Sequence, residues 1–125
     1  MLYMLFAMTL NAQIVTTSPA FPTESDPVTI TFAASNGAAG LNNCNCGVSL
    51  HTGVITSYST GNSDWKHVFT TWGVANPAWK MTALGNNLFT YKFAPSLRSA
   101  FSVTGAETIQ KIALVFRNGD GTKEG

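Results

Sequence analysis

The chain has 125 residues, of which 10% are charged, and its formal net charge at pH 7 is +1. This length suits one domain but not two. The seven lysines and arginines are scattered along the chain instead of forming a basic face, which argues against a nucleic-acid partner. Many threonine, serine, asparagine and glycine residues with few charges are typical of exported β-proteins, and such a surface suits neutral ligands such as sugars.

The N-terminal stretch "MLYMLFAMT" is apolar and uncharged. It is too short to span a bilayer as a helix. With the small residue Ala12 behind it, it indicates a secretory signal peptide over residues 1–12, cleaved before Gln13. No basic segment precedes the apolar run, so we expect this signal to be truncated at its start; the alternative is a buried N-terminal strand. Residues 13–125 would then form the mature protein, secreted or held at the cell surface without membrane insertion.

The first half of the mature chain predicts two strands. In "VTITF" (28–32), apolar and hydroxyl residues alternate with the period of a half-buried strand. A loop rich in glycine and asparagine follows at 36–45. In "GVSLH" (47–51), His51 lies on the face opposite Leu50. We therefore expect His51 to end its strand at the following Thr-Gly turn, with its ring directed away from the core.

The second half predicts further short strands. "WKHVFTTW" (65–72) fits a strand at period 2, and "WKMTAL" (79–84) with "NNLFTYKF" (86–93) fits a hairpin closed by a Gly-Asn-Asn turn. "PSLRSAF" (95–101) is the only plausible helical turn, with proline at its first position. "IQKIALVFR" (109–117) is the most apolar strand, so we expect it to be central.

Short strands separated by turn signals indicate an all-β protein, an antiparallel immunoglobulin-like β-sandwich. Neither an internal repeat nor a domain linker is visible in the sequence. The chain stops at Gly125, just after a hairpin-type turn, although the apolar strand at 112–116 requires a partner. We therefore expect the sandwich to lack its C-terminal strand and the chain to be a fragment of a larger protein.

Two cysteines, Cys44 and Cys46, stand one residue apart in the Gly/Asn loop. With His51 and His67 they would make a Cys2His2 set, but their spacing matches no zinc-finger pattern. A disulfide across one residue is geometrically demanding, while an exported protein favours oxidation. A local disulfide or a pair of loop thiols is therefore the favoured interpretation, with metal binding and redox catalysis as weaker alternatives. We predict neither a metal nor a cofactor.

Catalytic patterns are weak in this sequence. No G-x-S-x-G elbow occurs, and the acidic residues lie mostly in expected loops. A glycosidase needs two carboxylates on either side of a cleft, which a chain of this size does not readily build. Asp64 is the only acid near the tryptophans, where a carboxylate more often bonds a sugar hydroxyl or caps a turn. We therefore predict that this chain is not an enzyme.

The aromatic residues are more informative. Trp65, Trp72 and Trp79 fall within fifteen residues, and Trp65 follows the polar run "GNSD". A tryptophan beside a loop is free to be exposed, and it offers a flat apolar face and one donor. Pyranose rings stack their C–H faces on an exposed indole, and their hydroxyl groups need polar partners around it. We expect these partners to be His51, Asn62, Asp64 and Lys66. The alternative is that all three indoles are buried.

The order of "VSLHTGVI", "DWKHV", "KMTALGNNLFTYKFAPSLR" and "AETIQKIALVFRNGDGTKEG" resembles N-terminal β-sandwich modules of secreted bacterial α-amylase-type proteins. It is also similar to starch-binding modules of the family 25 and 26 type. In those modules a strand histidine or tyrosine and a loop tryptophan contact glucose rings, and another tryptophan follows the "VF" turn. The resemblance places His51 and Trp65 at the first two positions. Thr122 and Lys123 stand at the third, so part of the family's ligand platform is replaced.

The resemblance implies a non-catalytic carbohydrate-binding module, for α-glucan, carried by a secreted glycosidase whose catalytic domain follows this chain. We expect a monomer that binds an oligo- or polysaccharide, and neither a nucleic acid nor a membrane. The residues expected to contact the sugar are His51, Asp64, Trp65, Lys66, Trp72 and Lys123. The alternatives are an immunoglobulin-like spacer without a ligand and, less favoured, a small Cys/His metalloprotein.

Overall fold

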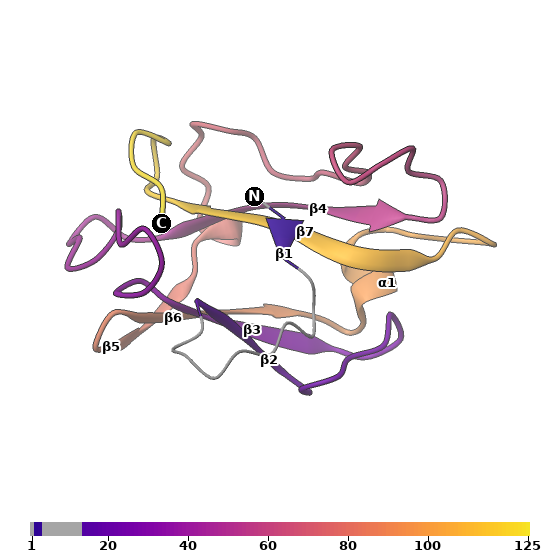
Figure 1. Ribbon diagram of the computed structural model, residues 1–125, viewed down its shortest axis with the longest axis horizontal. Coiled ribbons are helices and arrows are strands. Elements are labelled where there is room, and N and C mark those ends of the chain that lie inside the picture. Colours follow the sequence, from indigo (N-terminus) through magenta and orange to yellow (C-terminus); the bar gives the residue numbers. More distant parts are fainter. Residues whose placement is uncertain (1, 4–13) are drawn as a thin grey trace.

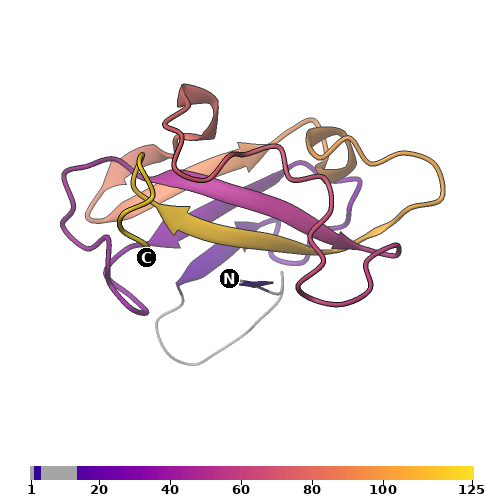
Figure 2. The same ribbon diagram turned by 90° about the horizontal axis from the view of Figure 1, so that it is seen from above.

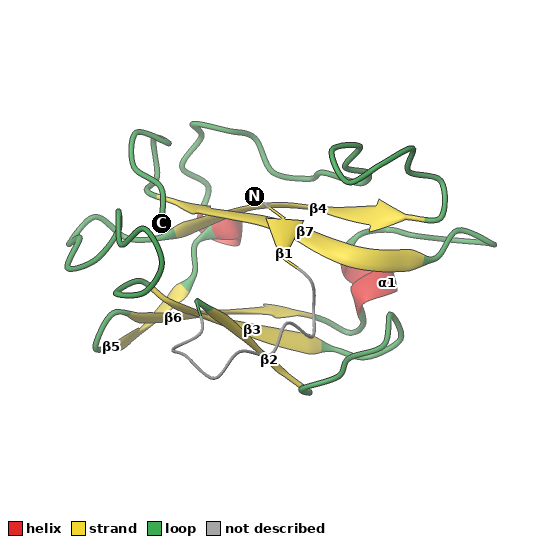
Figure 3. Cartoon of the chain, viewed as in Figure 1, coloured by secondary structure: helices red, strands yellow, loops and turns green. Residues whose placement is uncertain are grey.

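The computed structural model describes residues 2–3 and 14–125, which form two antiparallel sheets with only two short helical turns. The sheets lie one above the other, as Figures 1 and 3 show. The prediction of an all-β protein is therefore confirmed. Long loops at both ends of the sheets and over the upper sheet account for much of the remaining chain.

The lower sheet in Figure 1 has four strands, in the order β2 (Val15–Ser18), β3 (Val28–Ala33), β6 (Leu88–Phe93) and β5 (Thr82–Gly85). Side chains of β3 alternate between fully buried and half-buried, as its sequence predicted. The predicted hairpin joins β5 to β6. Its turn places Asn86 and Asn87 at φ 55° and 59°, a conformation that asparagine tolerates better than most residues.

The upper sheet has the order β1 (Leu2–Tyr3), β7 (Ile109–Arg117) and β4 (Ser49–Thr56). Strand β7 has the bounds predicted for it and is central in this sheet, as expected. Strand β1 pairs Leu2 with Ala113. It falls within the predicted signal peptide, of which the other residues, 1 and 4–12, lie outside the described part of the chain.

The bounds predicted around His51 are wrong. Strand β4 continues through the expected Thr-Gly turn to Thr56, so His51 lies within the strand, opposite Val115 of β7. The Thr-Gly pair is not a turn because Gly53 stays in register with Ala113. Glycine serves another purpose at this position, where it lets a neighbouring segment lie close to the strand.

The core fills the space between the sheets. Phe32 of β3 and Phe116 of β7 stack with ring centroids 4.0 Å apart, and both are almost completely buried. One end is closed by α1 (Leu97–Ala100), where the Ser96 side chain caps the helix by accepting a hydrogen bond from the Ser99 N–H group. The predicted helical turn is thus confirmed, although the proline precedes the cap instead of starting the helix. A second turn, η1 (Pro77–Trp79), was not predicted.

The strand predicted at 65–72 is absent. Residues 65–74, hereafter the crossing segment, run along and over β4 on the outer side of the upper sheet (Figures 1 and 2). Pairing is limited to one bridge, in which the N–H groups of Val54 and Lys66 donate to each other's carbonyl oxygens at 3.0 and 2.8 Å. His67 follows with φ 53°, which ends the extended conformation. The alternating sequence was therefore a misleading strand signal.

Candidate functional site

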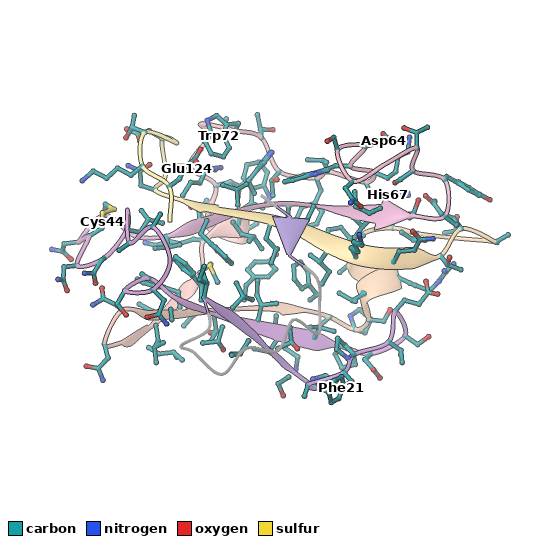
Figure 4. All side chains as sticks on the ribbon, in the orientation of Figure 1. Phe21, Cys44, Asp64, His67, Trp72 and Glu124 are labelled. Atoms are coloured by element: carbon teal, nitrogen blue, oxygen red, sulfur yellow. A yellow bond between two sulfur atoms is a disulfide. The ribbon has the colours of Figure 1, made fainter. Side chains whose placement is uncertain are left out.

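Three aromatic side chains meet on the outer side of the upper sheet. The ring of His51 lies 6.0 Å from Trp65 in a tilted arrangement and 5.4 Å from Trp72 in an edge-to-face one. Strand β4 supplies the histidine and the crossing segment supplies both tryptophans. Figure 4 shows Trp72 at the outer surface of this sheet. We call His51, Trp65 and Trp72 the aromatic row.

The structure places none of the three tryptophans in the core. Trp72 is 43% exposed, while Trp65 and Trp79 are half-buried. The alternative that all three indoles are buried is therefore wrong. Trp65, the tryptophan that its place beside a polar loop indicated as free to be exposed, is less exposed than Trp72. Trp65 packs over β4, with its Cβ 3.4 Å from the place that a side chain at Gly53 would occupy.

The ring of His51 is fixed by a hydrogen bond with Thr70. The Thr70 hydroxyl oxygen accepts a hydrogen bond from the Thr52 N–H group at 3.1 Å and lies 2.8 Å from His51 Nδ1. The Thr70 hydroxyl therefore links the main chain of β4 to the imidazole, and which of the two groups donates depends on the tautomer of His51. Burial, and next the charge of Arg117, lower the pKa of His51. The aromatic row thus carries a polar imidazole beside two indoles.

Arg117 is the residue that sequence reasoning missed. Its side chain is fully buried, yet it forms no ion pair among the described residues. Its Nη1 and Nη2 groups donate instead to four main-chain oxygens at 2.8–3.0 Å, those of Thr71, Val74, Asn118 and Gly119. The only signal in the sequence was a cation at the end of the most apolar strand.

The Arg117 guanidinium also supports Trp72. Its central carbon lies 5.5 Å from the centroid of the indole, a cation–π distance. Two of the carbonyl oxygens it binds belong to the crossing segment and two belong to the turn after β7. Burial lowers the pKa of this guanidinium, which remains charged at neutral pH. Arg117 therefore fixes the loop that presents Trp72.

The predicted rim residues Asp64 and Lys66 form an ion pair of 3.2 Å where the crossing segment begins. The Asp64 carboxylate also accepts a hydrogen bond from the Thr60 N–H group at 3.0 Å, and so caps a turn. This bond, followed by that from Lys66, lowers the pKa of Asp64. Both side chains adjoin Trp65 in the chain, and Figure 4 shows Asp64 on the outer side of the sheet.

Lys123 lies in the turn after β7, where its main chain forms two hydrogen bonds with Asn118. The same turn abuts Trp72, since a Cβ at Gly121 would lie 2.8 Å from the indole nitrogen. The Lys123 side chain itself is exposed and forms no ion pair among the described residues. The structure thus brings the turn to the aromatic row but shows no contact between the row and the Lys123 side chain.

A second polar cluster anchors the crossing segment near its start, on the side away from Trp72. The Glu107 carboxylate lies 2.9 Å from His67 Nε2 and accepts a hydrogen bond from the Thr56 hydroxyl at 2.7 Å. Glu107 is buried. The bond from Thr56, followed by that from His67, lowers the pKa of Glu107. His67 therefore holds the segment in place and stands apart from the cysteines with which a metal site was considered.

The Glu107 carboxylate makes the stability of the fold sensitive to acid. A carboxyl group whose pKa is lowered on folding stabilises the fold above its ordinary value, 4.5 here, and this contribution is lost as the pH falls through the folded-state pKa. We expect Glu107→Gln to be less stable than the wild type at pH 7, with the difference shrinking steadily below pH 4.5. Urea unfolding at a series of pH values measures it. Glu124→Gln, at an exposed side chain, is the control, and a pH-independent difference would contradict the prediction.

The structure also places the two cysteines. Cys44 and Cys46 are joined by a disulfide, with Cα atoms 5.2 Å apart. No group of three or more histidine, cysteine or acidic side chains in the described ranges is placed to hold a metal ion. Likewise, no helix there is long and apolar enough to cross a membrane. Comparisons of the sequence with protein-family models and with curated proteins found no match.

Proposed function

We propose that this chain is an immunoglobulin-like β-sandwich that binds carbohydrate without catalysis, as the module of a secreted glycosidase. The observation that carries the proposal is the aromatic row, in which a partly exposed indole, a histidine and a second indole adjoin on one face. The resemblance of the sequence to starch-binding modules favours α-glucan. The Cys44–Cys46 disulfide supports an oxidising compartment, as expected for a secreted or surface protein.

Binding would rest on stacking. The Arg117 guanidinium lies over the Trp72 ring, the turn after β7 abuts the edge of that ring, and the His51 ring packs against it edge-to-face. Trp72 is nevertheless 43% exposed, and the exposed part of its indole would contact the C–H groups of one glucose ring. The imidazole of His51 would form a hydrogen bond with a sugar hydroxyl beside it. A platform of one or two rings gives weak binding, with a micromolar to millimolar Kd, or about 4 to 8 kcal/mol.

Maltooligosaccharides are expected to change the tryptophan fluorescence of the chain, and Trp72→Ala is expected to weaken their binding at least about tenfold, or 1.4 kcal/mol. Trp72 is exposed, so its loss should leave the fold intact. Trp65→Ala should weaken binding as well, but it should also destabilise the fold because Trp65 packs over β4. Fluorescence titration and calorimetry measure the affinities.

Tyr58→Ala is the matched control, because Tyr58 is 61% exposed and lies outside the aromatic row. Its affinity for maltooligosaccharides should equal that of the wild type. Unchanged binding by Trp72→Ala would remove the aromatic row as the site. An intact chain that binds no α-glucan would leave the immunoglobulin-like spacer as the better reading.

A further inference from the structure

A cavity of about 310 Å³ lies at the start of β4, and its lining contains no member of the aromatic row. Its walls come from the disulfide loop, the first residue of β4, the chain leading into η1, and the turn after β7. Figure 4 marks this end of the molecule by Cys44. Cavities of this size hold small molecules in many proteins.

Three hydrogen-bond donors line this cavity. Ser49 is only 5% exposed, and its hydroxyl has no hydrogen-bond partner among the described residues. The Asn76 side-chain oxygen accepts from the Ala78 N–H group at 2.9 Å, which leaves the amide nitrogen free to donate. The Lys80 ammonium completes the set. Lys80 is the only charged residue in the described lining, so the cavity has one positive charge without an acid to neutralise it.

The walls of the cavity are held rigidly. Ser49 and Lys80 form a main-chain bridge, and the Cys44–Cys46 disulfide constrains the adjoining loop. The opposite wall is fixed by Arg117, which binds the carbonyl oxygen of Gly119. A site that is already ordered loses little conformational entropy when a ligand binds.

Glycine is required at one wall. Gly47 has φ +72°, and a Cβ there would lie 3.2 Å from Lys80 Cε and 3.6 Å from the ammonium nitrogen. The Lys80 side chain therefore lies directly against the main chain of the disulfide loop. Because glycine has no side chain, the Lys80 ammonium group can lie at the cavity wall beside Gly47.

We propose that this cavity is a second binding site, for a small ligand that carries one carboxylate and is no larger than a single pyranose ring, such as a sugar acid. Lys80 would provide the charge, and Ser49 and Asn76 would donate hydrogen bonds to the ligand's oxygen atoms. An unpaired cation beside two neutral donors favours an anionic oxygen ligand over a neutral one. This site is independent of the aromatic row and of the glucan proposed to bind there.

Glucuronate and glucose test the proposal, because they share a pyranose ring and differ in a carboxylate at C5 instead of a hydroxymethyl group. Titration followed by NMR shifts of the backbone amides should place glucuronate at residues 47, 49, 76 and 80, with glucose at least about tenfold weaker. Lys80→Gln should lower the affinity for glucuronate about tenfold or more, and Ser49→Ala should lower it too. Rising salt should weaken the interaction.

Lys92→Gln is the matched control, since Lys92 is an exposed lysine on β6 of the other sheet, and it should bind glucuronate as the wild type does. Trp72→Ala should also retain glucuronate binding, which separates this site from the aromatic row. Equal affinities for glucose and glucuronate, or an undiminished affinity in Lys80→Gln, would overturn the proposal. Neither result would affect glucan binding at Trp72.

Discussion

Replacing Arg117 with methionine is expected to lower the free energy of unfolding by at least about 3 kcal/mol. The guanidinium donates to four main-chain oxygens and is fully buried. Each buried acceptor that loses its donor costs about 1–3 kcal/mol, unless water reaches it. Methionine would fill much of the space but satisfy none of these oxygens. Urea unfolding gives the stability, and near-ultraviolet circular dichroism reports the order of Trp72.

The variant Arg117→Lys tests whether the positive charge alone, without the planar guanidinium, stabilises the fold. Lysine keeps the positive charge but lacks the planar fork that reaches oxygens of two loops at once, so we expect an intermediate stability. The Trp72 signal should weaken in both variants, because both release the crossing segment from the turn after β7. A loss below about 1 kcal/mol in Arg117→Met would show that the loops hold their positions without the guanidinium.

A leucine at position 53 is expected to destabilise the fold by about 1–3 kcal/mol and to abolish glucan binding. Even a Cβ at Gly53 would lie 2.7 Å from Cγ2 of Val68 and 3.1 Å from the main-chain oxygen of Lys66. The side chain of Val68 can rotate away, but the main chain at Lys66 has to move. That movement would break the bridge between Lys66 and Val54 and displace the adjoining Trp65.

Gly61→Leu is the control for this variant, since a Cβ at Gly61 would meet nothing within 4 Å. It should match the wild type in both stability and glucan affinity. If Gly53→Leu retained glucan binding with normal stability, the crossing segment would be free to shift without consequence for the site. Unfolding in urea and titration with maltooligosaccharides together distinguish these outcomes.

Local patterns predicted much of the fold. The alternation of β3, the apolar run of β7 and the Gly-Asn-Asn turn between β5 and β6 each express their conformation within a few residues. The errors occurred where distant contacts decide the conformation. In the sequence, Gly53 has the local pattern of a turn residue. Its actual role is to make room for a segment that lies more than ten residues later in the chain, and no local pattern shows that contact.

The candidate site was only half predictable for the same reason. His51 and Trp65 could be named from their residue types and their places beside expected loops. The exposed position of Trp72 could not be predicted from the sequence, because it depends on Arg117. The Arg117 side chain donates to carbonyl oxygens 43 and 46 positions away in the chain. Main-chain oxygens are present at every residue, so no side-chain pattern marks those that a buried cation will bind.

The crossing segment should also limit the self-association of this chain in concentrated solution. The exposed edge of a strand invites pairing with other chains, which leads to aggregation. Along the free edge of β4, the N–H group of Val54 donates to Lys66, that of Thr52 donates to the Thr70 hydroxyl, and Ser49 is bridged to Lys80. The crossing segment, which presents both tryptophans of the aromatic row, therefore occupies the amides of Thr52 and Val54 that a neighbouring chain would need, and Lys80 covers the start of the strand. Variants that loosen the row should accordingly become more prone to self-association as well as weaker in binding.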